Sequence, residues 1–354
     1  MTGLAKNQMM IYVGKMKKLS LICLFLAGCA SSHFCNAQGL PGLEHKNDSA
    51  ITTTLLTPDI GGIKQVVEVK TNDVNKPILL FVSGGPGSSM MNSSESFTAT
   101  LRKRFTIVQW DQRDAGKTLK LNASPVAPSL ELMQKDTVQI IEFIRKTYRK
   151  EKIYLLGSSW GNVLGFYIVK HHPEMLHAYY AVNPVVSQLA SEKELLAILK
   201  RHLQENAEAT RELAGVQIPF TRDEDLFYLR KWLFFKEGKT FATTEDFKVN
   251  FLQWSKRWSP VWNQVMQIDL PKSLAKVDIP TYFFVGGHDI QTSTNITQEY
   301  FLNIQAPKKK LFLFEKSGHQ IHQDEPQRFQ DTIIRTLDEG QPGYALPPTS
   351  PHPR

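Results

Sequence analysis

Cysteine is missing from most of this 354-residue chain. Its three cysteines, Cys23, Cys29 and Cys35, all fall within the first 37 residues. The rest of the chain therefore has no disulfide, no thiolate metal ligand and no cysteine nucleophile. Any covalent chemistry there must use a different nucleophile.

The N-terminus also lacks an apolar run long enough to span a bilayer, because residues 19–27 are too few. A lysine-rich segment precedes this run, and the combination is typical of an export signal over residues 1–37. Two processing routes remain open. The four residues ending at Cys29 resemble a bacterial lipobox, which would make Cys29 a lipid anchor and the only membrane contact. Cleavage after Ala37 would instead release the protein. Both routes predict a location in a bacterial-type cell envelope, in the periplasm or outside the cell.

Signals for metal, cofactor or nucleic-acid binding are missing as well. The histidines outside the motifs described below lack the spacing of a ligand set, and we expect them on the surface or in loops: His171, His172, His288 and His322. The formal net charge is +8, but four of the 42 basic residues and none of the 34 acidic ones precede position 38. No basic stripe alternates with aromatic residues, as a nucleic-acid surface would require. We expect no metal, no organic cofactor and no nucleic-acid partner, and the oligomeric state is left open.

What the sequence does contain is a Gly-x-Ser-x-Gly segment between a strand pattern and a helix pattern. Residues 152–156 are apolar and β-prone, residues 157–161 read Gly-Ser-Ser-Trp-Gly, and residues 162–171 have apolar residues at helical spacing. This context is typical of a nucleophile elbow, a turn so tight that it needs small residues. It predicts Ser159 as a nucleophile exposed at the carboxyl end of a parallel strand.

A serine nucleophile needs a base and a group that orients the base, and both follow in the order Ser, Asp, His. Residues 280–285 form a strand pattern that leads to Asp289, and residues 310–314 form another that leads to His319. Catalytic groups collect at the carboxyl ends of strands in open α/β sheets. The pattern predicts a catalytic triad of Ser159, Asp289 and His319.

A glycine-rich loop predicts the oxyanion hole. Residues 76–82 form a strand pattern that ends in Ser83-Gly84-Gly85-Pro86-Gly87. Acyl transfer places negative charge on a carbonyl oxygen, and backbone N–H groups are its usual donors. We assign one donor to the N–H of Gly85, with Gly84 as the alternative, and the other to the N–H of Trp160.

Three segments together resemble signatures of the proline iminopeptidase-like branch of the α/β-hydrolases, which usually read HGGPG, DQRGxGxS and GxSWG. Here they read SGGPG at 83–87, DQRDAGKT at 111–118 and GSSWG at 157–161. The similarity extends over about residues 51–337. It implies the same roles for Ser159, Asp289 and His319, and oxyanion amides at Gly85 and Trp160.

Two positions depart from the family pattern. Ser83 replaces a histidine, and Asp114 replaces a glycine. Asp114 falls in a turn, where aspartate tolerates left-handed backbone geometry. Beside it, Arg113 is expected to brace the loop through an ion pair rather than to contact substrate.

The order of elements predicts an α/β-hydrolase fold: a mostly parallel central sheet with helices on both faces and an inserted helical cap. We assign residues 38–186 and 276–339 to the core, residues 187–275 to the cap and residues 340–354 to a disordered proline-rich tail. Within the cap we expect helices over 192–212, 223–237 and 244–258.

Three functions are compatible with these residues. The first is an exported aminopeptidase that removes a small N-terminal residue, the second a capped carboxylesterase or lactonase, and the third a non-catalytic binding protein. Iminopeptidases hold the substrate's α-ammonium group with acidic cap residues, and no local pattern chooses among the candidates here: Glu192, Glu194, Glu205, Glu224, Asp225 and Glu237. The substrate would be a small peptide or a small ester.

Overall fold

A computed structural model describes residues 50–339 of the chain. The predicted export signal, including Cys29 and Ala37, and the predicted tail lie outside the described residues. Eight strands form one sheet in the order β1-β4-β6-β5-β7-β8-β9-β10. β4 is antiparallel to both of its neighbours, and the pairs from β6 to β10 are parallel. The strands of this sheet are β1 Thr52–Leu56, β4 Val66–Thr71, β5 Ile78–Val82, β6 Thr106–Asp111, β7 Ile153–Ser158, β8 Leu176–Val182, β9 Thr281–Gly286 and β10 Lys309–Phe314, and β2 Asp59–Ile60 pairs with β3 Ile63–Lys64 in a small hairpin.

The central strands are buried on both faces, as expected for parallel strands covered by helices. In β5, Leu80 and Val82 join the core on one face, whereas Leu79 and Phe81 join the core on the other. This alternation divides the interior into two apolar layers with the sheet between them.

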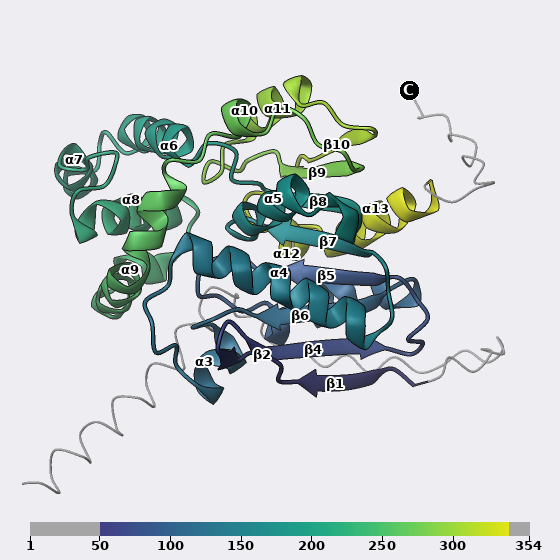
Figure 1. The fold of residues 1–354 in the computed structure, drawn as a ribbon. Helices are drawn as coiled ribbons and strands as arrows, with labels where there is room; N and C mark the ends of the chain where they lie inside the picture. Colours follow the sequence, from purple (N-terminus) through teal and green to yellow (C-terminus); the bar gives the residue numbers. More distant parts are fainter. Residues whose placement is uncertain (1–49, 340–354) are drawn as a thin grey trace, which may run out of the picture.

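Helices cover both faces of the sheet (Figure 1). On one face pack α4 Leu130–Thr147, α5 Gly161–His171 and α11 Thr294–Asn303. On the other pack α2 Glu95–Thr98, η2 Leu101–Lys103, α12 Ile321–Asp324 and α13 Pro326–Asp338. Ser129 caps the start of α4, with its Oγ accepting the N–H of Leu132 at 3.2 Å. Short elements complete the core: η1 Met91–Ser93, α3 Gly116–Leu121 and η3 Pro173–Met175. The predicted α/β-hydrolase architecture is confirmed.

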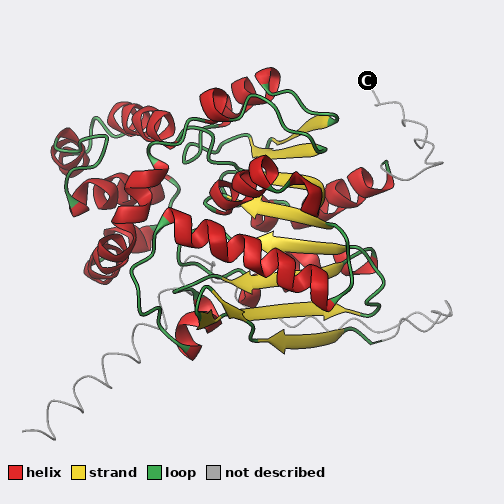
Figure 2. Ribbon diagram, in the orientation of Figure 1, coloured by secondary structure: helices red, strands yellow, loops and turns green. Residues whose placement is uncertain are grey.

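A helical segment lies between β8 and β9 and contains α6 Gln188–His202, α7 Ala207–Ala214, α8 Asp223–Lys236, η4 Thr240–Thr243, α9 Glu245–Val265 and α10 Leu270–Ser273. Its two ends meet at a bridge between Ser187 and Asp269. Figure 2 shows α6 to α9 gathered on the side toward which β5 and β7 point. We call residues 187–275 the cap. It stands over the carboxyl ends of the parallel strands, where the predicted site residues are expected.

Two helix predictions in the cap were wrong in detail. Residues 192–212 do not form one helix, because Asn206 begins a new one by accepting the N–H of Ala209 at 3.0 Å. The helix predicted to end at residue 258 continues to Val265, through Pro260. Its apolar face beyond Pro260, with Val261, Trp262 and Val265, is buried, and this packing outweighs the local cost of proline.

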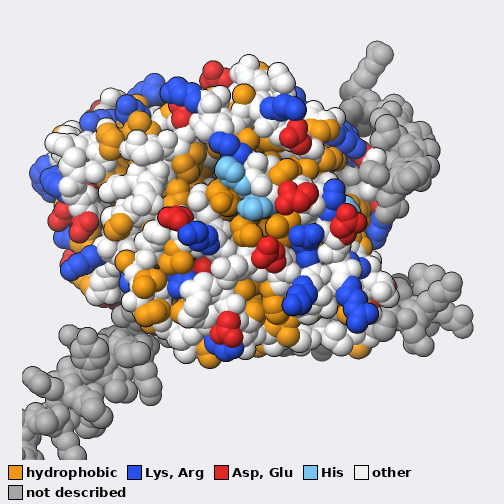
Figure 3. Space-filling view, in the orientation of Figure 1, with side chains coloured by type: hydrophobic (Ala, Val, Ile, Leu, Met, Phe, Trp, Pro, Cys, Tyr) orange, Lys and Arg blue, Asp and Glu red, His pale blue; other side chains and the backbone are white. Residues whose placement is uncertain are grey.

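Residues 50–339 include no helix that is both long and apolar enough to cross a membrane. On the face shown in Figure 3, acidic and basic side chains are interspersed with apolar ones over the surface.

Candidate active site

The predicted elbow is a sharp turn between β7 and α5. Ser159 has a positive φ of 53°, a backbone conformation that non-glycine residues rarely adopt. A Cβ at Gly161 would lie 2.1 Å from the carbonyl oxygen of Val82, so only glycine fits where the new helix passes the neighbouring strand. The N–H of Ser159 donates to the carbonyl of Val182 at 3.0 Å and ties the turn to β8. These constraints fix the direction of the Ser159 side chain.

The structure brings Ser159, His319 and Asp289 into one hydrogen-bonded chain. His319 Nε2 lies 2.9 Å from Ser159 Oγ, and His319 Nδ1 lies 2.8 Å from Asp289 Oδ2. Asp289 lies 130 positions after Ser159, and His319 lies 30 positions after Asp289. In this order the three residues follow the ends of β7, β9 and β10. Such an arrangement can carry a proton from the serine hydroxyl to the imidazole.

Asp289 is almost completely buried and well supplied with donors. Its Oδ1 accepts the N–H of Gln291 at 2.8 Å, and its Oδ2 accepts the hydroxyl of Thr292 at 2.7 Å. Burial alone would raise the pKa of this carboxyl, but the charge of His319 and the hydrogen bonds from His319 and Thr292 hold the pKa below its ordinary value. Asp289 therefore stays ionised and can orient the imidazole.

Opposing effects also act on His319. Burial alone would lower the pKa of its imidazole, but the charge and hydrogen bond of Asp289, with a further contribution from Glu237, raise the pKa above its ordinary value. Arg230 acts in the opposite direction. The surroundings therefore stabilise the imidazolium that would form after proton transfer from Ser159.

The glycine-rich loop lies directly against Ser159, since a Cβ at Gly84 would be 3.2 Å from the Ser159 Cβ. Gly85 has a φ of 121°. Gln112 links this loop to the elbow: its Nε2 donates to the carbonyl of Ser83 at 2.9 Å, and its Oε1 accepts the indole N–H of Trp160 at 3.1 Å. The loop with Gly84 and Gly85 and the start of α5 with Trp160 thus both adjoin Ser159, where an oxyanion hole would need its donors.

Arg113 is fully buried, and its ion-pair partner is Asp136 on α4. Its Nε donates to Asp136 Oδ2 at 3.0 Å, its Nη1 to Ser124 Oγ at 2.9 Å and its Nη2 to the carbonyl of Gly61 at 2.8 Å. These contacts join the loop after β6 to α4 and to the β2–β3 hairpin. They hold the loop after β6 in place, and they occupy all three guanidinium nitrogens, so none is directed to Ser159.

Asn183 is a residue that sequence reasoning missed. It directly follows β8 and has a φ of 43°, and its Nδ2 donates to the carbonyl of His319 at 2.8 Å. Its Oδ1 accepts the N–H of Gly286 at 2.8 Å. One buried side chain thus joins the loops that carry Asp289 and His319. The only signal in the sequence is its place at a strand end.

Of the six acidic cap residues, three are already engaged. Glu192 forms a buried ion pair with Arg230, Glu194 accepts the hydroxyl of Ser293 at 2.6 Å, and Asp225 accepts N–H groups at the start of α8. Glu205 and Glu224 are exposed.

Glu237, just after α8, differs from the other five. After Asp289 it is the carboxylate that acts most strongly on His319. Its side chain is accessible to solvent, yet enough protein surrounds it for burial to raise the pKa of its carboxyl. It is therefore a solvent-accessible acid whose charge acts on His319.

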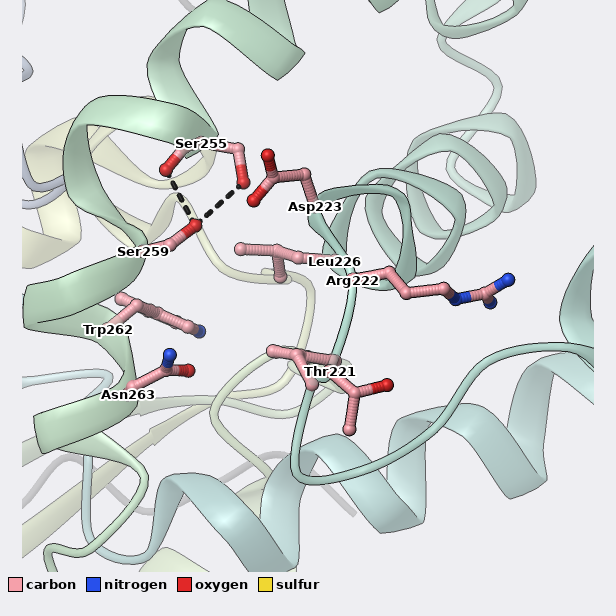
Figure 4. A pocket seen from close by; sticks show the side chains of 9 residues that line it. Thr221, Arg222, Asp223, Leu226, Ser255, Ser259, Trp262 and Asn263 are labelled. Carbon is pink, nitrogen blue, oxygen red and sulfur yellow. Dashed lines mark hydrogen bonds between the residues drawn. The ribbon is translucent and has the colours of Figure 1, made fainter.

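The cap also holds a small cavity of about 70 Å³ between the start of α8 and α9, lined on the α9 side by Ser255, Ser259, Trp262 and Asn263. Figure 4 shows these side chains opposite Thr221 and Leu226, with Arg222 pointing away. Within residues 50–339, the indole nitrogen of Trp262 is buried without a hydrogen-bond partner. None of Ser159, Asp289 and His319 lines this cavity, so it is separate from their contact.

One of the four histidines predicted to lie on the surface or in a loop does not do so. His322, expected on the surface or in a loop, is buried on α12, with its ring 4.7 Å from that of Phe97, and burial lowers its pKa to about 3. The described residues show no cluster of three or more His, Cys, Asp or Glu side chains placed to hold a metal ion.

Comparisons with known proteins support the family and the fold. Residues 77–326 match the family model described as alpha/beta hydrolase fold. A probable aminopeptidase, YbaC, from Bacillus subtilis is 27% identical over 305 residues, which cover 78% of this chain and 93% of that protein. A proline iminopeptidase from Heyndrickxia coagulans is 23% identical over 77% of this chain and 94% of its own length.

Among solved structures, the proline iminopeptidase of Mycobacterium smegmatis superposes with a TM-score of 0.57 at 18% identity, covering 81% of this chain and 98% of that one. This last likeness concerns the fold alone. The motifs, the fold and the family match agree: the chain is a hydrolase enzyme and belongs to the alpha/beta hydrolase fold family, with proline iminopeptidases among its relatives.

Proposed function

We propose that this protein is a serine hydrolase that works through an acyl-enzyme on Ser159. His319 takes the hydroxyl proton as Ser159 Oγ bonds to the substrate carbonyl carbon, and the N–H groups of Gly85 and Trp160 hold the resulting oxyanion. The C–N or C–O bond then breaks as His319 returns the proton to the leaving group. Water attacks the acyl-enzyme by the same route and releases the acid. The observation that carries the proposal is the continuous contact from Asp289 through His319 to Ser159.

The most suitable substrate is a short peptide whose small N-terminal residue, such as proline, is removed. The relatives named as a probable aminopeptidase and a proline iminopeptidase support this choice. Glu237 supports it independently, because a solvent-accessible carboxylate whose charge acts on His319 can bind a free α-ammonium group when it is ionised. A simple ester or lactone has no ammonium group for such a carboxylate to bind.

The nucleophile can be tested with a fluorophosphonate probe, which reacts with activated serines. Ser159→Ala should abolish labelling and turnover, while Ser158→Ala, the matched change one residue earlier, should leave labelling in place. Labelling that survives in Ser159→Ala would disprove the mechanism.

Substrate choice can be tested with three compounds. The first is a prolyl arylamide, the second is the same arylamide with its amino group acetylated, and the third is a short-chain aryl ester. An aminopeptidase should cleave the first and reject the second. Turnover of the ester alone would favour the carboxylesterase or lactonase. Absence of both labelling and turnover in folded protein would leave a binding protein on this scaffold.

We also propose that the protein is exported, on the strength of the charged and apolar segments before residue 38. The mass of the mature N-terminus in a bacterial host distinguishes the two routes: a diacylglyceryl group on Cys29, or an unmodified start at Gln38. An uncleaved chain that stays in the cytoplasm would contradict export.

A further inference from the structure

Asp114, which replaces the family's usual glycine, has a partner in the cap. It adopts a φ of 58°, and its Oδ1 accepts the N–H of Ser124 at 3.1 Å. Its Oδ2 accepts from Arg257 Nη2 on α9 at 2.6 Å. The unusual residue in the core loop is therefore one half of an ion pair that fastens α9 to the core.

The same side of α9 also contacts the glycine-rich loop. Trp254 Nε1 donates to the carbonyl of Pro86 at 2.9 Å. Trp258, one helical turn later, is buried so tightly against the loop that a Cβ at Gly87 would lie 2.8 Å from its Nε1. Because residues three and four apart share one face of a helix, Trp254, Arg257 and Trp258 form a single contact surface.

The glycine-rich loop is thus held from two sides. On the inner side, Gln112 binds the carbonyl of Ser83 and connects it to Trp160. On the outer side, Trp254 binds the carbonyl of Pro86, the residue that follows Gly85. Within the loop, the Ser83 hydroxyl donates to the carbonyl of Ser88 at 3.0 Å, but Gly84 and Gly85 between them add no side-chain contacts that would fix their own backbone. The direction of the Gly85 N–H then depends on both attachments.

We propose that Trp254 is a positioning residue of the oxyanion hole, and that the Arg257–Asp114 ion pair holds α9 in the position that Trp254 needs. The cap is then part of the machinery for the chemical step, besides shaping the pocket. This inference rests on the proposed acyl transfer at Ser159. Since the oxyanion exists only in the transition state and intermediate, a misdirected Gly85 N–H lowers kcat and leaves substrate binding nearly unchanged.

The test is Trp254→Phe, which removes the indole N–H and keeps a ring beside Phe251, whose centroid lies 5.3 Å from that of Trp254. The matched control is Trp232→Phe, because the Trp232 indole donates to Glu212 at 2.8 Å entirely within the cap. We expect Trp254→Phe to lower kcat and the fluorophosphonate labelling rate about 10-fold with KM little changed. We expect Trp232→Phe to leave all three near wild type.

Arg257→Gln provides a second variant in case Trp254→Phe does not fold. Its effect on kcat should have the same direction and a smaller size, because the Arg257 side chain is 39% exposed and the ion pair is partly screened. Unchanged kcat in both variants, or an equal loss in Trp254→Phe and Trp232→Phe, overturns the inference. Activity that survives in Ser159→Ala overturns the proposed function instead, so the two failures are distinguishable.

Discussion

In the sheet, the side chains of the candidate active site follow the ends of β7, β9 and β10, and backbone hydrogen bonds between strands fix their positions. In the cap, position depends on side-chain partners instead. Arg230 pairs with Glu192, Lys231 with Glu208 and Glu212, and aromatic rings fill the space between α8 and α9.

The residues proposed to react with the substrate and the residues proposed to select it are thus held in place in different ways. A strand end is set by the topology of the whole sheet, so the reacting groups keep their places when surface residues change. A cap residue keeps its place only while its individual partner is present. We therefore expect changes in the core to affect the rate of reaction or the stability of the fold. Changes in the cap should affect which substrates react, except on the face of α9 that holds the glycine-rich loop, where they should affect the rate.

The largest effect is expected for Asp289→Asn in the core. An asparagine amide can donate to His319 Nδ1 and favour the wrong imidazole tautomer, and it no longer stabilises the imidazolium, so kcat should fall by about 10⁴-fold. The asparagine carbonyl oxygen can still accept the N–H groups of Gln291 and Thr292, so the variant should stay folded. Steady-state kinetics with circular dichroism measure both properties. A rate near wild type would mean that another group orients His319.

The next effect concerns stability and the Arg113–Asp136 pair. Asp136→Asn would leave the fully buried Arg113 without its counter-charge, and the free energy of unfolding in urea should fall by about 3–5 kcal/mol. Glu131→Gln, which breaks the exposed Glu131–Lys135 pair on the same helix, is the matched control and should leave the unfolding midpoint unchanged. Equal unfolding curves for the two variants would show that Arg113 is not a brace.

The same division decides how much could be predicted from sequence. Ser159, Asp289 and His319 each follow a recognisable strand pattern, and a parallel sheet brings its strand ends together, so their meeting was predictable. Arg113 was predicted to pair, but its partner was not, because Asp136 lies within a helix that carries no local sign of the contact.

Contacts between distant segments were not predictable at all. Asn183 reaches the carbonyl of His319 136 positions away, and Arg257 reaches Asp114 143 positions away. Neither pair has a characteristic sequence spacing, and neither belongs to a sequence motif. The choice of Glu237 among six acidic cap residues likewise depended on which of them already had partners, and only the fold supplies that information.

A smaller effect is expected for Glu237→Gln, the cap residue proposed to bind the α-ammonium group. A hydrogen bond to a charged group contributes about 1.5–3 kcal/mol, so KM for a prolyl arylamide should rise at least about 10-fold. KM for a short-chain ester should not change. Glu224→Gln, at the other end of α8, is the control. An equal rise for both substrates would show that Glu237 shapes the pocket without recognising the ammonium group.

The smallest effect is a shift in pH dependence, and it separates the charge of Glu237 from its contacts. The reaction needs neutral His319, and Asp289 raises the pKa of that imidazole, with Glu237 adding to the effect. In the wild type, kcat/KM for an ester should therefore rise with pH through a midpoint above about 6.5. Glu237→Gln removes one negative charge, so imidazolium is less stabilised, the pKa falls, and neutral His319 persists to lower pH. The midpoint should move down, while Glu224→Gln leaves it in place. An ester is the right substrate, since it has no ammonium group to titrate. A midpoint that stays fixed or moves up in Glu237→Gln would show that the charge of this carboxylate does not act on His319.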